Sequence, residues 1–526
     1  MLLWARKDFA RQPLSLQLYL FPIDAFVTWM IPYNDPCTAL ARCPVEIWCE
    51  ILRYATEAEG PDMQEDPLRM ERFYLEGAYS DEITDAYEDR LNAVVDMRNF
   101  AAVCRLWHAI LYPLRLRWVI LNQKDQLKGV SDSVNNLCKR EPVGRWTKRL
   151  EVRARITHGE LMERFDDPHG RKQPPIARML QCCPQLEEFI SMTSALSYPA
   201  LCSDLITNCG RTLRTVILRS SNAQQFDDIV NLLLYCPRLE YLHFGGPRYD
   251  PPTTSAEWDH PGARFGRSLN LKDIPQILFT RRLALRVLIW EVKHSDPSEQ
   301  LTFARLFGML RLPRLRHLGL HMNEWSGVVD DSQFMQSQML PMLSQPGVSL
   351  SSLSLTRTTA GARNRHSLAF LELCPNLHTL AFHLPHTSAY DLSLYLRAPL
   401  YCLRHVVLHE FFYNPPEFSP FLLAEHTSTV LRIFKLLCRL TLFPNLCWIQ
   451  LSDVHAVSDE TRVLRASHGD FPEEYRGLMH ILLRLAHVRR LALVDGEGMH
   501  IGPDFASPAW YYAWGWEGIG VSGSVG

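Results

Sequence analysis

The chain has 526 residues, 47% of them hydrophobic, and its formal net charge is −2. This length exceeds what one ordinary hydrophobic core holds, so we expect several units or one long solenoid. The near-neutral charge favours neither a nucleic-acid partner nor a membrane-surface partner, and we expect no contact with either. The 14 cysteines form no C-x-x-C pair and mostly stand in apolar runs. This usage favours buried, reduced thiols over a zinc site, and it predicts a cytoplasmic and/or nuclear protein.

Residues 1–37 are predicted to be an apolar leader. Its most apolar part, 14–32, is interrupted by Gln17, Pro22 and Asp24, so it holds no clean stretch of about 20 apolar residues of the kind that spans a membrane. We expect the leader to pack on the body of the protein. The alternative interpretations are a signal anchor and a mis-predicted first exon.

Residues 38–121 are predicted to form a small helical unit with two amphipathic helices. The first has Pro44 in its N-terminal turn, where proline is tolerated, and an apolar stripe of Ile47, Ile51 and Leu52. Two helices make a very small core, which suggests that part of the stripe is an interface. The second helix has apolar residues at helical spacing, namely Phe100, Val103, Cys104, Trp107, Ile110 and Leu111, and is expected to end at Pro113.

An acidic insert, about 56–98, separates the two helices. Residues 56–90 contain 12 Asp and Glu against 3 Arg, together with several Gly and Pro residues. This composition is typical of a mobile, solvated loop. The alternative is a docking site for a basic partner.

Residues 145–495 contain eleven copies of an apolar pattern close to L-x-x-L-x-L. Two of them read "CPRLEYLHF" (236–244) and "CPNLHTLAFH" (374–383). Several copies are spaced by 26 or 27 residues, and the longer intervals fit the same unit with loop insertions. The copies begin at 147, 186, 213, 239, 285, 315, 350, 377, 403, 446 and 488.

This spacing predicts an α/β leucine-rich-repeat solenoid, with parallel strands on a concave face and helices and loops on the convex face. The last two leucines of the pattern are two residues apart and therefore point to one face of a short strand. One such strand cannot bury its own face, whereas stacked strands build a continuous core. The alternative is an irregular, leucine-rich α/β domain. Residues 496–526 are predicted to be a C-terminal cap that becomes a flexible, Gly-rich tail.

The third, fifth and seventh residues of each copy are expected to point away from the helices, on the face where solenoids bind partners. Aromatic and imidazole side chains recur there, and these suit protein recognition. The alternative is that exposed strand positions accept histidine without purpose. We expect no metal site, because the histidines stand on separate turns without a completing Cys or carboxylate, and we expect no cofactor. The candidate target-binding residues are Tyr241, His243, His317, His321, His383, His405, His409 and Trp448.

"CPVEIWCEILRYA" (43–55) followed by "FAAVCRLWHAI" (100–110) resembles an F-box, and the split layout ahead of a repeat domain is similar to the F-box proteins of mushroom-forming fungi. The sequence departs from the family pattern in two places, since Cys43 replaces the usual leucine and the insert is long. The resemblance implies docking on a Skp-type adaptor that ties the chain to a cullin–RING ubiquitin ligase. The alternative for each matching residue is an ordinary core position. The matching residues are Pro44, Ile47, Ile51, Leu52, Val103, Cys104 and Trp107.

We therefore expect a non-enzymatic substrate-receptor subunit of an SCF-type ubiquitin ligase, with the repeats recognising a protein target. The sequence has no G-x-x-x-x-G-K-[ST] loop, no G-x-S-x-G elbow and no H-E-x-x-H pair, so no catalytic set is expected. The alternative is a leucine-rich-repeat scaffold with no ligase link, in which the helices form an N-terminal cap.

Overall fold

The computed structural model describes residues 44–56, 92–93, 95–97, 99–121, 143–153, 175–191, 201–218, 226–245, 274–292, 304–322, 340–344, 346–356, 368–383, 398–409, 411, 420–452, 454–457, 463–466, 469–470, 473–496 and 500–501. The predicted leader, most of the acidic insert and the Gly-rich tail lie outside these residues. The chain divides into two compact units, Met1–Leu269 and Asn270–Gly526, and each is described by itself.

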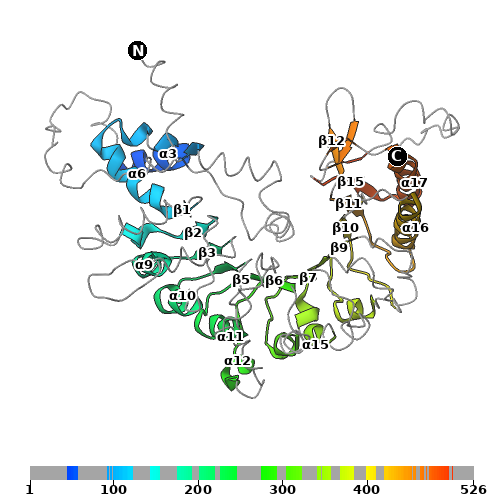
Figure 1. The fold of residues 1–526 in the computed structure, drawn as a ribbon, viewed down its shortest axis with the longest axis horizontal. Helices are drawn as coiled ribbons and strands as arrows, with labels where there is room; N and C mark the ends of the chain where they lie inside the picture. Colours follow the sequence, from blue (N-terminus) through cyan, green and yellow to red (C-terminus); the bar gives the residue numbers. More distant parts are fainter. Residues whose placement is uncertain are drawn as a thin grey trace, which may run out of the picture. The chain divides into compact units, whose positions relative to one another are not determined.

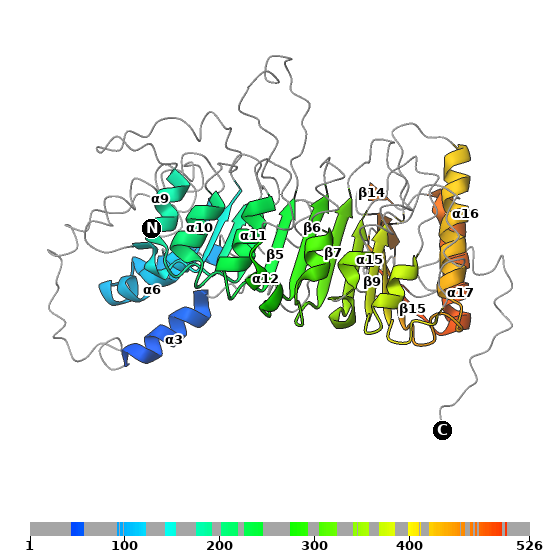
Figure 2. The ribbon, with the colours of Figure 1, turned by 90° about the horizontal axis from the view of Figure 1, so that it is seen from below.

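The first unit is a parallel sheet with helices on one face. Its strands pair in chain order from β1 to β5, and each neighbouring pair is parallel. The helices α9, α10 and α11 lie side by side along one face of these strands (Figures 1 and 2). The elements are α3 (Val45–Thr56), α6 (Arg105–Arg117), β1 (Trp118–Leu121), η3 (Val143–Trp146), β2 (Arg149–Val152), α9 (Pro175–Cys182), β3 (Glu188–Ser191), α10 (Leu201–Cys209), β4 (Thr215–Leu218), α11 (Phe226–Tyr235) and β5 (Tyr241–Gly245).

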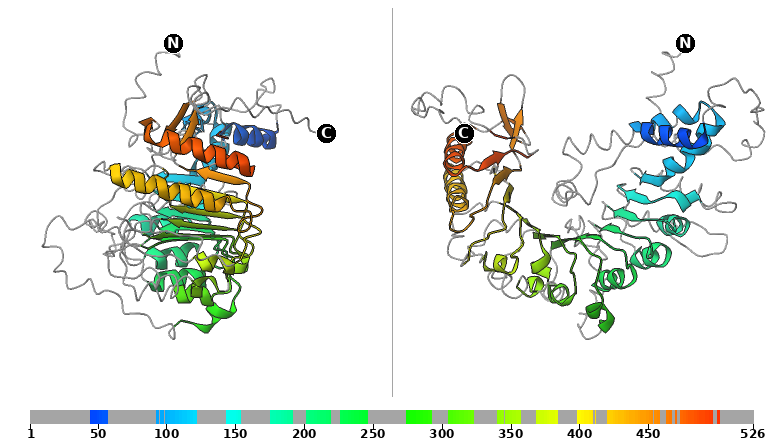
Figure 3. Two further views of the ribbon diagram at one scale, coloured as in Figure 1. Left: turned by 90° about the vertical axis from the view of Figure 1, so that its right-hand side faces the viewer. Right: turned by 180° about the vertical axis from the view of Figure 1, so that it is seen from behind.

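The second unit continues the pattern with parallel strands in the order β6-β7-β8-β9-β10-β11-β15. Its two long helices, α16 and α17, pack alongside each other (Figure 3). A small antiparallel sheet, β12-β13-β14, is inserted between β11 and α17. The elements are α12 (Gln276–Thr280), β6 (Val287–Val292), β7 (His317–Met322), α15 (Leu340–Leu343), η8 (Pro346–Ser349), β8 (Ser352–Thr356), η9 (Leu368–Leu373), β9 (Thr379–His383), β10 (His405–His409), α16 (Pro420–Leu437), β11 (Trp448–Leu451), β12 (Val454–Val457), β13 (Val463–Ala466), β14 (Gly469–Asp470), α17 (Glu473–Arg489) and β15 (Ala492–Val494).

One carbonyl ahead of each strand sets the register of the repeats. The carbonyl oxygen of Lys148 accepts two N–H bonds from the next repeat, from Glu187 at 2.7 Å and from Glu188 at 2.8 Å. The carbonyl of Arg316 does the same for Ser351 and Ser352, at 2.9 Å each. We call the residue just before each strand the ladder position. Its paired bonds align neighbouring strands, so they also fix which side chains face the helices.

The α/β class and the parallel stacking of the repeats are confirmed, and the strands begin where the pattern predicts in every copy but the last. In that copy the register pairs Trp448 with Ala492, so the repeat begins at Arg490 and the predicted start at Val488 is wrong by two residues. The reason is that α17 continues to Arg489 and carries Val488 on its exposed side.

The strand β1 is an additional difference. It occupies Trp118–Leu121, the end of the stretch that is expected to be helical, and it pairs with β2 along its whole length. The sequence of this strand is Trp-Val-Ile-Leu, and aromatic and β-branched residues of this kind favour extended backbone. The helical stretch therefore passes directly into the repeat sheet.

The single helix expected between residue 99 and Pro113 is interrupted by a turn. The described residues 92–93, 95–97 and 99–101 are helical, a turn follows at 102–103, and α6 begins at Arg105. Cys104 caps α6, because its backbone is extended and its Sγ accepts a hydrogen bond from the N–H of Trp107 at 3.5 Å. The sequence pattern concealed this break because the side chains on both sides of it enter the same core.

The helix α6 continues through Pro113 to Arg117, although Pro113 is expected to end it. Leu111 is fully buried and Leu114 packs against the same core, so residues on both sides of the proline are held in place. Packing of this kind stabilises a helix beyond the backbone hydrogen bond that a proline removes.

Candidate interaction surfaces

The helix α3 exposes an apolar stripe, which we define as Pro44, Ile47, Ile51 and Tyr54. The carbonyl oxygen of Pro44 accepts N–H bonds from Ile47 at 3.1 Å and from Trp48 at 3.3 Å, so the proline sits at the start of the helix. The stripe residues recur three and four positions apart and therefore share one face of α3. Ile47 is 48% exposed, Ile51 46% and Tyr54 90%, so this apolar face is largely open to solvent.

The opposite side of α3 packs on a small helical core. Leu52 is buried together with Met97, Ala101 and Leu111. Two of the predicted adaptor-contact residues, Leu52 and Trp107, therefore serve this core. Trp107 fills its edge, where its ring lies 5.1 Å from Trp48 and 6.0 Å from Phe100, measured between ring centroids.

The remaining two predicted adaptor-contact residues lie at the turn before α6. Val103 is 58% exposed, whereas Cys104 is partly buried and serves as the N-cap. Val95 adds another exposed apolar side chain on the preceding helical segment. Sequence reasoning missed Val95 because it falls in the range assigned to the acidic insert. The period of Ala93, Met97 and Ala101, four residues apart, was the signal for a helix there.

The helical core is joined to the repeat sheet through α6. The ring of Tyr112 meets that of Trp146 edge to face, with 5.7 Å between centroids, and the N–H of Lys148 donates to the carbonyl of Arg117 at 2.9 Å. Arg145 stacks over the ring of Trp146 at 4.2 Å. The helical segment thus covers the first repeat in the way that a capping element covers the end of a stack.

The sheet face opposite the helices, here called the front face, is largely buried. Tyr241 and His243 are buried in the first unit, as are His317, His321 and His409 in the second. The Nδ1 of His317 lies 2.9 Å from the hydroxyl oxygen of Ser352 on the neighbouring strand. These predicted target-binding residues lie on the predicted face, but their side chains are not available to a partner in this conformation.

The exposed part of the front face lies near the end of the second unit. Trp448 is 53% exposed, and the ring of His405 meets it edge to face with 5.8 Å between centroids. His383 lies on β9 in register with His409, and its side chain is outside the described residues. The structure therefore brings together one predicted pair, His405 and Trp448, as a surface that a partner can reach.

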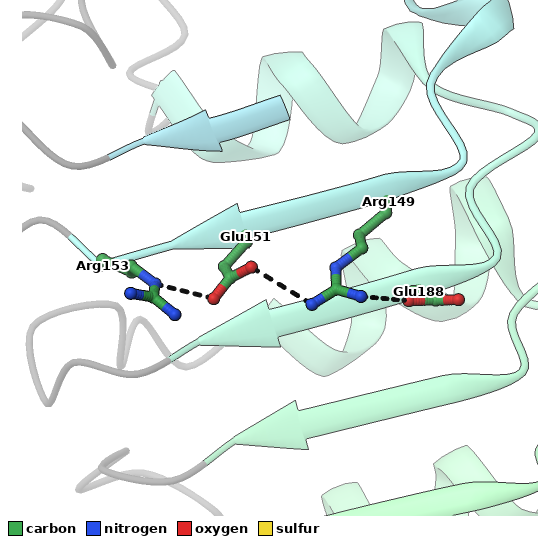
Figure 4. A network of polar contacts seen from close by, with 4 residues as sticks. All are labelled: Arg149, Glu151, Arg153 and Glu188. Atoms are coloured by element: carbon green, nitrogen blue, oxygen red, sulfur yellow. Dashed lines mark hydrogen bonds and ion pairs between the residues drawn. The ribbon is translucent and has the colours of Figure 1, made fainter. Parts of the chain in front are cut away.

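A buried charge network occupies the front face of β2 and β3 (Figure 4). The carboxylate of Glu151 is fully buried between two guanidinium groups, 2.8 Å from Arg153 and 3.4 Å from Arg149. Arg149 also reaches Glu188 at 3.4 Å, and it stacks over the ring of Trp118 at 4.3 Å. Sequence reasoning did not single out these residues, although Arg149 and Glu151 follow the alternation of the strand.

The cysteines at the helix-to-strand junctions are buried thiols. The carbonyl oxygens of Cys236 and Cys374 each accept the N–H of the first leucine of the repeat at 3.1 Å. Burial raises the pKa of both thiols to about 12. These thiols therefore stay protonated at neutral pH, and the backbone of each cysteine shapes the turn.

Within the described part of the chain, no three His, Cys, Asp or Glu side chains are grouped so that they could hold a metal ion. Of the helices that the structure describes, none is both long and apolar enough to cross a bilayer. A comparison of the chain with models of protein families gives no match, and no curated protein matches it. The exposed stripe of α3 and the repeat surface are thus the features on which a functional assignment can be built.

Proposed function

We propose that the chain is a substrate-receptor subunit of an SCF-type ubiquitin ligase, in which the helices dock on a Skp-type adaptor and the repeats recognise a protein target. The observation that carries the proposal is the exposed apolar stripe of α3. A helix that leaves Ile47 and Ile51 nearly half exposed, in a unit that also exposes Val103, presents the kind of surface that a protein partner covers.

The sorting of the F-box-like residues supports the same proposal. Those that stay on the surface are Pro44, Ile47, Ile51 and Val103, and those that hold the helices together are Leu52, Cys104 and Trp107. A docking helix needs both sets, because the core fixes the angle at which the stripe is presented. The receptor itself performs no catalysis in this proposal, and its contribution is to raise the local concentration of the target near the ligase.

The test is co-purification of the full chain with a fungal Skp-type adaptor. Ile47→Asp and Ile51→Asp each place a charge on the stripe, and we expect either to lower adaptor affinity by about 2 kcal/mol or more, roughly 30-fold, since an apolar anchor is lost and a charge is buried. The measurement is the dissociation constant by calorimetry, with thermal unfolding of each variant as a check of the fold.

Cys49→Asp is the matched control. Cys49 is exposed on the same helix, two residues from both isoleucines, so it lies about 160° around the helix axis from each. We expect the adaptor affinity of this variant to stay within about twofold of the parent. Adaptor binding that is absent in the parent, or equal in all variants, would contradict the receptor proposal.

A scaffold with no ligase link is the second candidate. The contact of Tyr112 with Trp146 favours it, because this contact makes the helical segment a cap for the first repeat. In that case the chain has no affinity for the adaptor, and its stripe is covered by another partner. The same co-purification separates the two candidates.

A further inference from the structure

The ladder position carries a different charge pattern in each unit. In the first unit Arg117 precedes β1, and the signs alternate from the next repeat onward through Lys148, Glu187, Arg214 and Glu240. Lys148 pairs with Glu187 at 2.6 Å. Ahead of the seven repeat strands of the second unit no carboxylate occupies this position, which reads Arg286, Arg316, Ser351, His378, Arg404, Cys447 and Leu491. The same backbone position therefore carries both bases and acids in the first unit, whereas in the repeats of the second unit it carries bases and no acid.

Arginines gather around this position in the first two repeats of the second unit. The backbones of Arg282 and Arg311 lie side by side in a parallel bridge, and the N–H of Arg316 donates to the carbonyl of Arg286 at 2.8 Å. We call Arg282, Arg286, Arg311, Arg314 and Arg316 the arginine edge. All five are exposed. In the described residues of these repeats, 274–292 and 304–322, the one carboxylate is Glu291, which is buried on β6.

The geometry of the edge suits a row of carboxylates. Neighbouring strands lie about 4.8 Å apart, so backbone neighbours such as Arg286 and Arg316 start their side chains at that spacing. A guanidinium group binds a carboxylate through two parallel hydrogen bonds and keeps its charge at any physiological pH. A concentration of positive charge on a chain whose net charge is −2 creates a local potential that attracts an anionic partner.

We propose that the arginine edge binds a carboxylate-rich peptide segment. The occupant is a peptide because two exposed apolar side chains, Ile277 and Met309, stand shortly ahead of the arginines in their repeats and offer contacts that side chains of a peptide use. In the described residues of the two repeats no aromatic ring is fully exposed for a nucleic-acid base to stack on, since Trp290 and Phe307 are buried and Phe279 is partly buried. That the peptide belongs to a ubiquitination target rests on the proposed function, whereas the binding does not.

The test is fluorescence anisotropy of the full chain with a fluorescein-labelled peptide of about 16 residues, in which Asp and Glu alternate with Leu, Ala and Gly. The same peptide with Asn and Gln in place of the acids is the ligand control. We expect Arg311→Gln/Arg314→Gln/Arg316→Gln to raise the dissociation constant roughly tenfold, and added salt to weaken the parent's binding.

The matched control variant is Arg211→Gln/Arg214→Gln/Arg238→Gln. It removes the same charge from exposed arginines near the corresponding turns of the first unit. We expect its dissociation constant to stay within about twofold of the parent. Circular dichroism and thermal unfolding of both triple variants establish that they fold.

Several results would overturn the proposal. They are an unchanged affinity in the Arg311/Arg314/Arg316 variant, an equal loss in the control variant, equal binding of the Asn/Gln peptide, and displacement of the acidic peptide by a lower concentration of a single-stranded oligonucleotide. Peptide binding that appears only after residues 57–91 are replaced by a Gly-Ser linker would assign the edge to the chain's own acidic insert. Adaptor binding is measured on the same variants. It tests the proposed function separately, because the arginine edge and the stripe of α3 are different surfaces.

Discussion

The helix α3 and the strands of the two sheets differ in what they leave exposed. On α3, Ile47 and Ile51 keep nearly half of their side-chain surface exposed, whereas His243 and His317 on the strands are fully buried. Among the described residues, α3 packs on the helical core through the side that carries Leu52, so its other side is open although it is apolar. The difference teaches that polarity does not decide exposure in this chain. The exposure of a side chain depends instead on where it lies relative to the packed layers of helices and strands.

The largest effect that tests this contrast is expected at Glu151. Glu151→Ala leaves Arg149 and Arg153 without the buried carboxylate between them, and we expect the first unit to lose about 3–5 kcal/mol of unfolding free energy. Urea unfolding followed by circular dichroism measures the loss.

The control for Glu151 is an ion pair on α3. Glu50 and Arg53 are 2.6 Å apart with both side chains more than half exposed, so Glu50→Ala is expected to cost no more than about 1 kcal/mol. If Glu151→Ala lowers the unfolding free energy by less than about 1 kcal/mol, water reaches the charge network of the front face, contrary to its burial.

The next prediction compares the stability changes of two neighbouring substitutions on α3. Leu52→Ala removes a buried side chain from the helical core, and we expect it to destabilise the first unit by about 2–4 kcal/mol. Ile51→Ala removes an exposed side chain of the stripe, and we expect less than about 1 kcal/mol. Thermal unfolding of the two variants in the absence of any adaptor measures the difference. Equal losses would mean that the stripe is covered within the chain.

Much of the architecture could be predicted from the sequence because its periods are those of the elements themselves. The leucines two residues apart predict a strand face, and the proline after Cys236 or Cys374 predicts where the preceding helical turn stops. The stripe of Ile47 and Ile51 follows from helical spacing in the same way.

Burial of the front face could not be predicted, because alternation shows which residues share a face and carries no information on what covers it. The break between Ala101 and Arg105 was hidden for a related reason. Phe100 and Trp107 contact each other across the turn, so the apolar spacing continues although the helix does not. The last repeat was misplaced because Val488 has the residue type of a repeat position while α17 extends through it.

Thiol reactivity should separate exposed from buried positions within each unit. Cys49 and Cys447 are exposed, whereas burial raises the pKa of Cys236 and Cys374 to about 12. We expect brief treatment with iodoacetamide at pH 8 to label the first pair at least tenfold faster than the second, because the thiolate is the reacting species. Mass spectrometry of peptides measures the rates, and rapid labelling of Cys236 would contradict the burial of this junction.

The same thiols give a pH dependence of defined sign. An unfolded cysteine ionises near pH 8.5, whereas Cys236 and Cys374 keep their protons in the fold up to about pH 12. Their contribution to stability is therefore complete below about pH 8.5 and is lost as the pH rises toward 12. The measurement is the free energy of unfolding of the parent, Cys236→Ala and Cys374→Ala at pH 8 and pH 10. We expect the decrease in this free energy between the two pH values to be smaller in each variant than in the parent.

A small effect is expected at Arg490, the residue after α17, and Gly210, the residue after α10, provides the comparison. Arg490 follows α17 with a φ of 57°, a left-handed conformation that suits glycine. The N–H of Leu491 donates to the carbonyl oxygen of Ala486 at 2.9 Å, and the N–H of Arg490 donates to that of His487 at 3.0 Å. This pair of hydrogen bonds is typical of helices that end in a glycine. In the first unit, Gly210 follows α10, and a Cβ there would lie 2.6 Å from the carbonyl oxygen of Ile206.

Exchanging the residue types should therefore act in opposite directions. We expect Arg490→Gly to raise the melting temperature by a few degrees, corresponding to about 0.5–1 kcal/mol, because the strain of the left-handed residue is relieved. We expect Gly210→Ala to destabilise the first unit by about 1–3 kcal/mol through the clash with Ile206. Calorimetry resolves both changes, and a destabilising Arg490→Gly would mean that the arginine side chain contributes more to the end of α17 than its backbone strain costs.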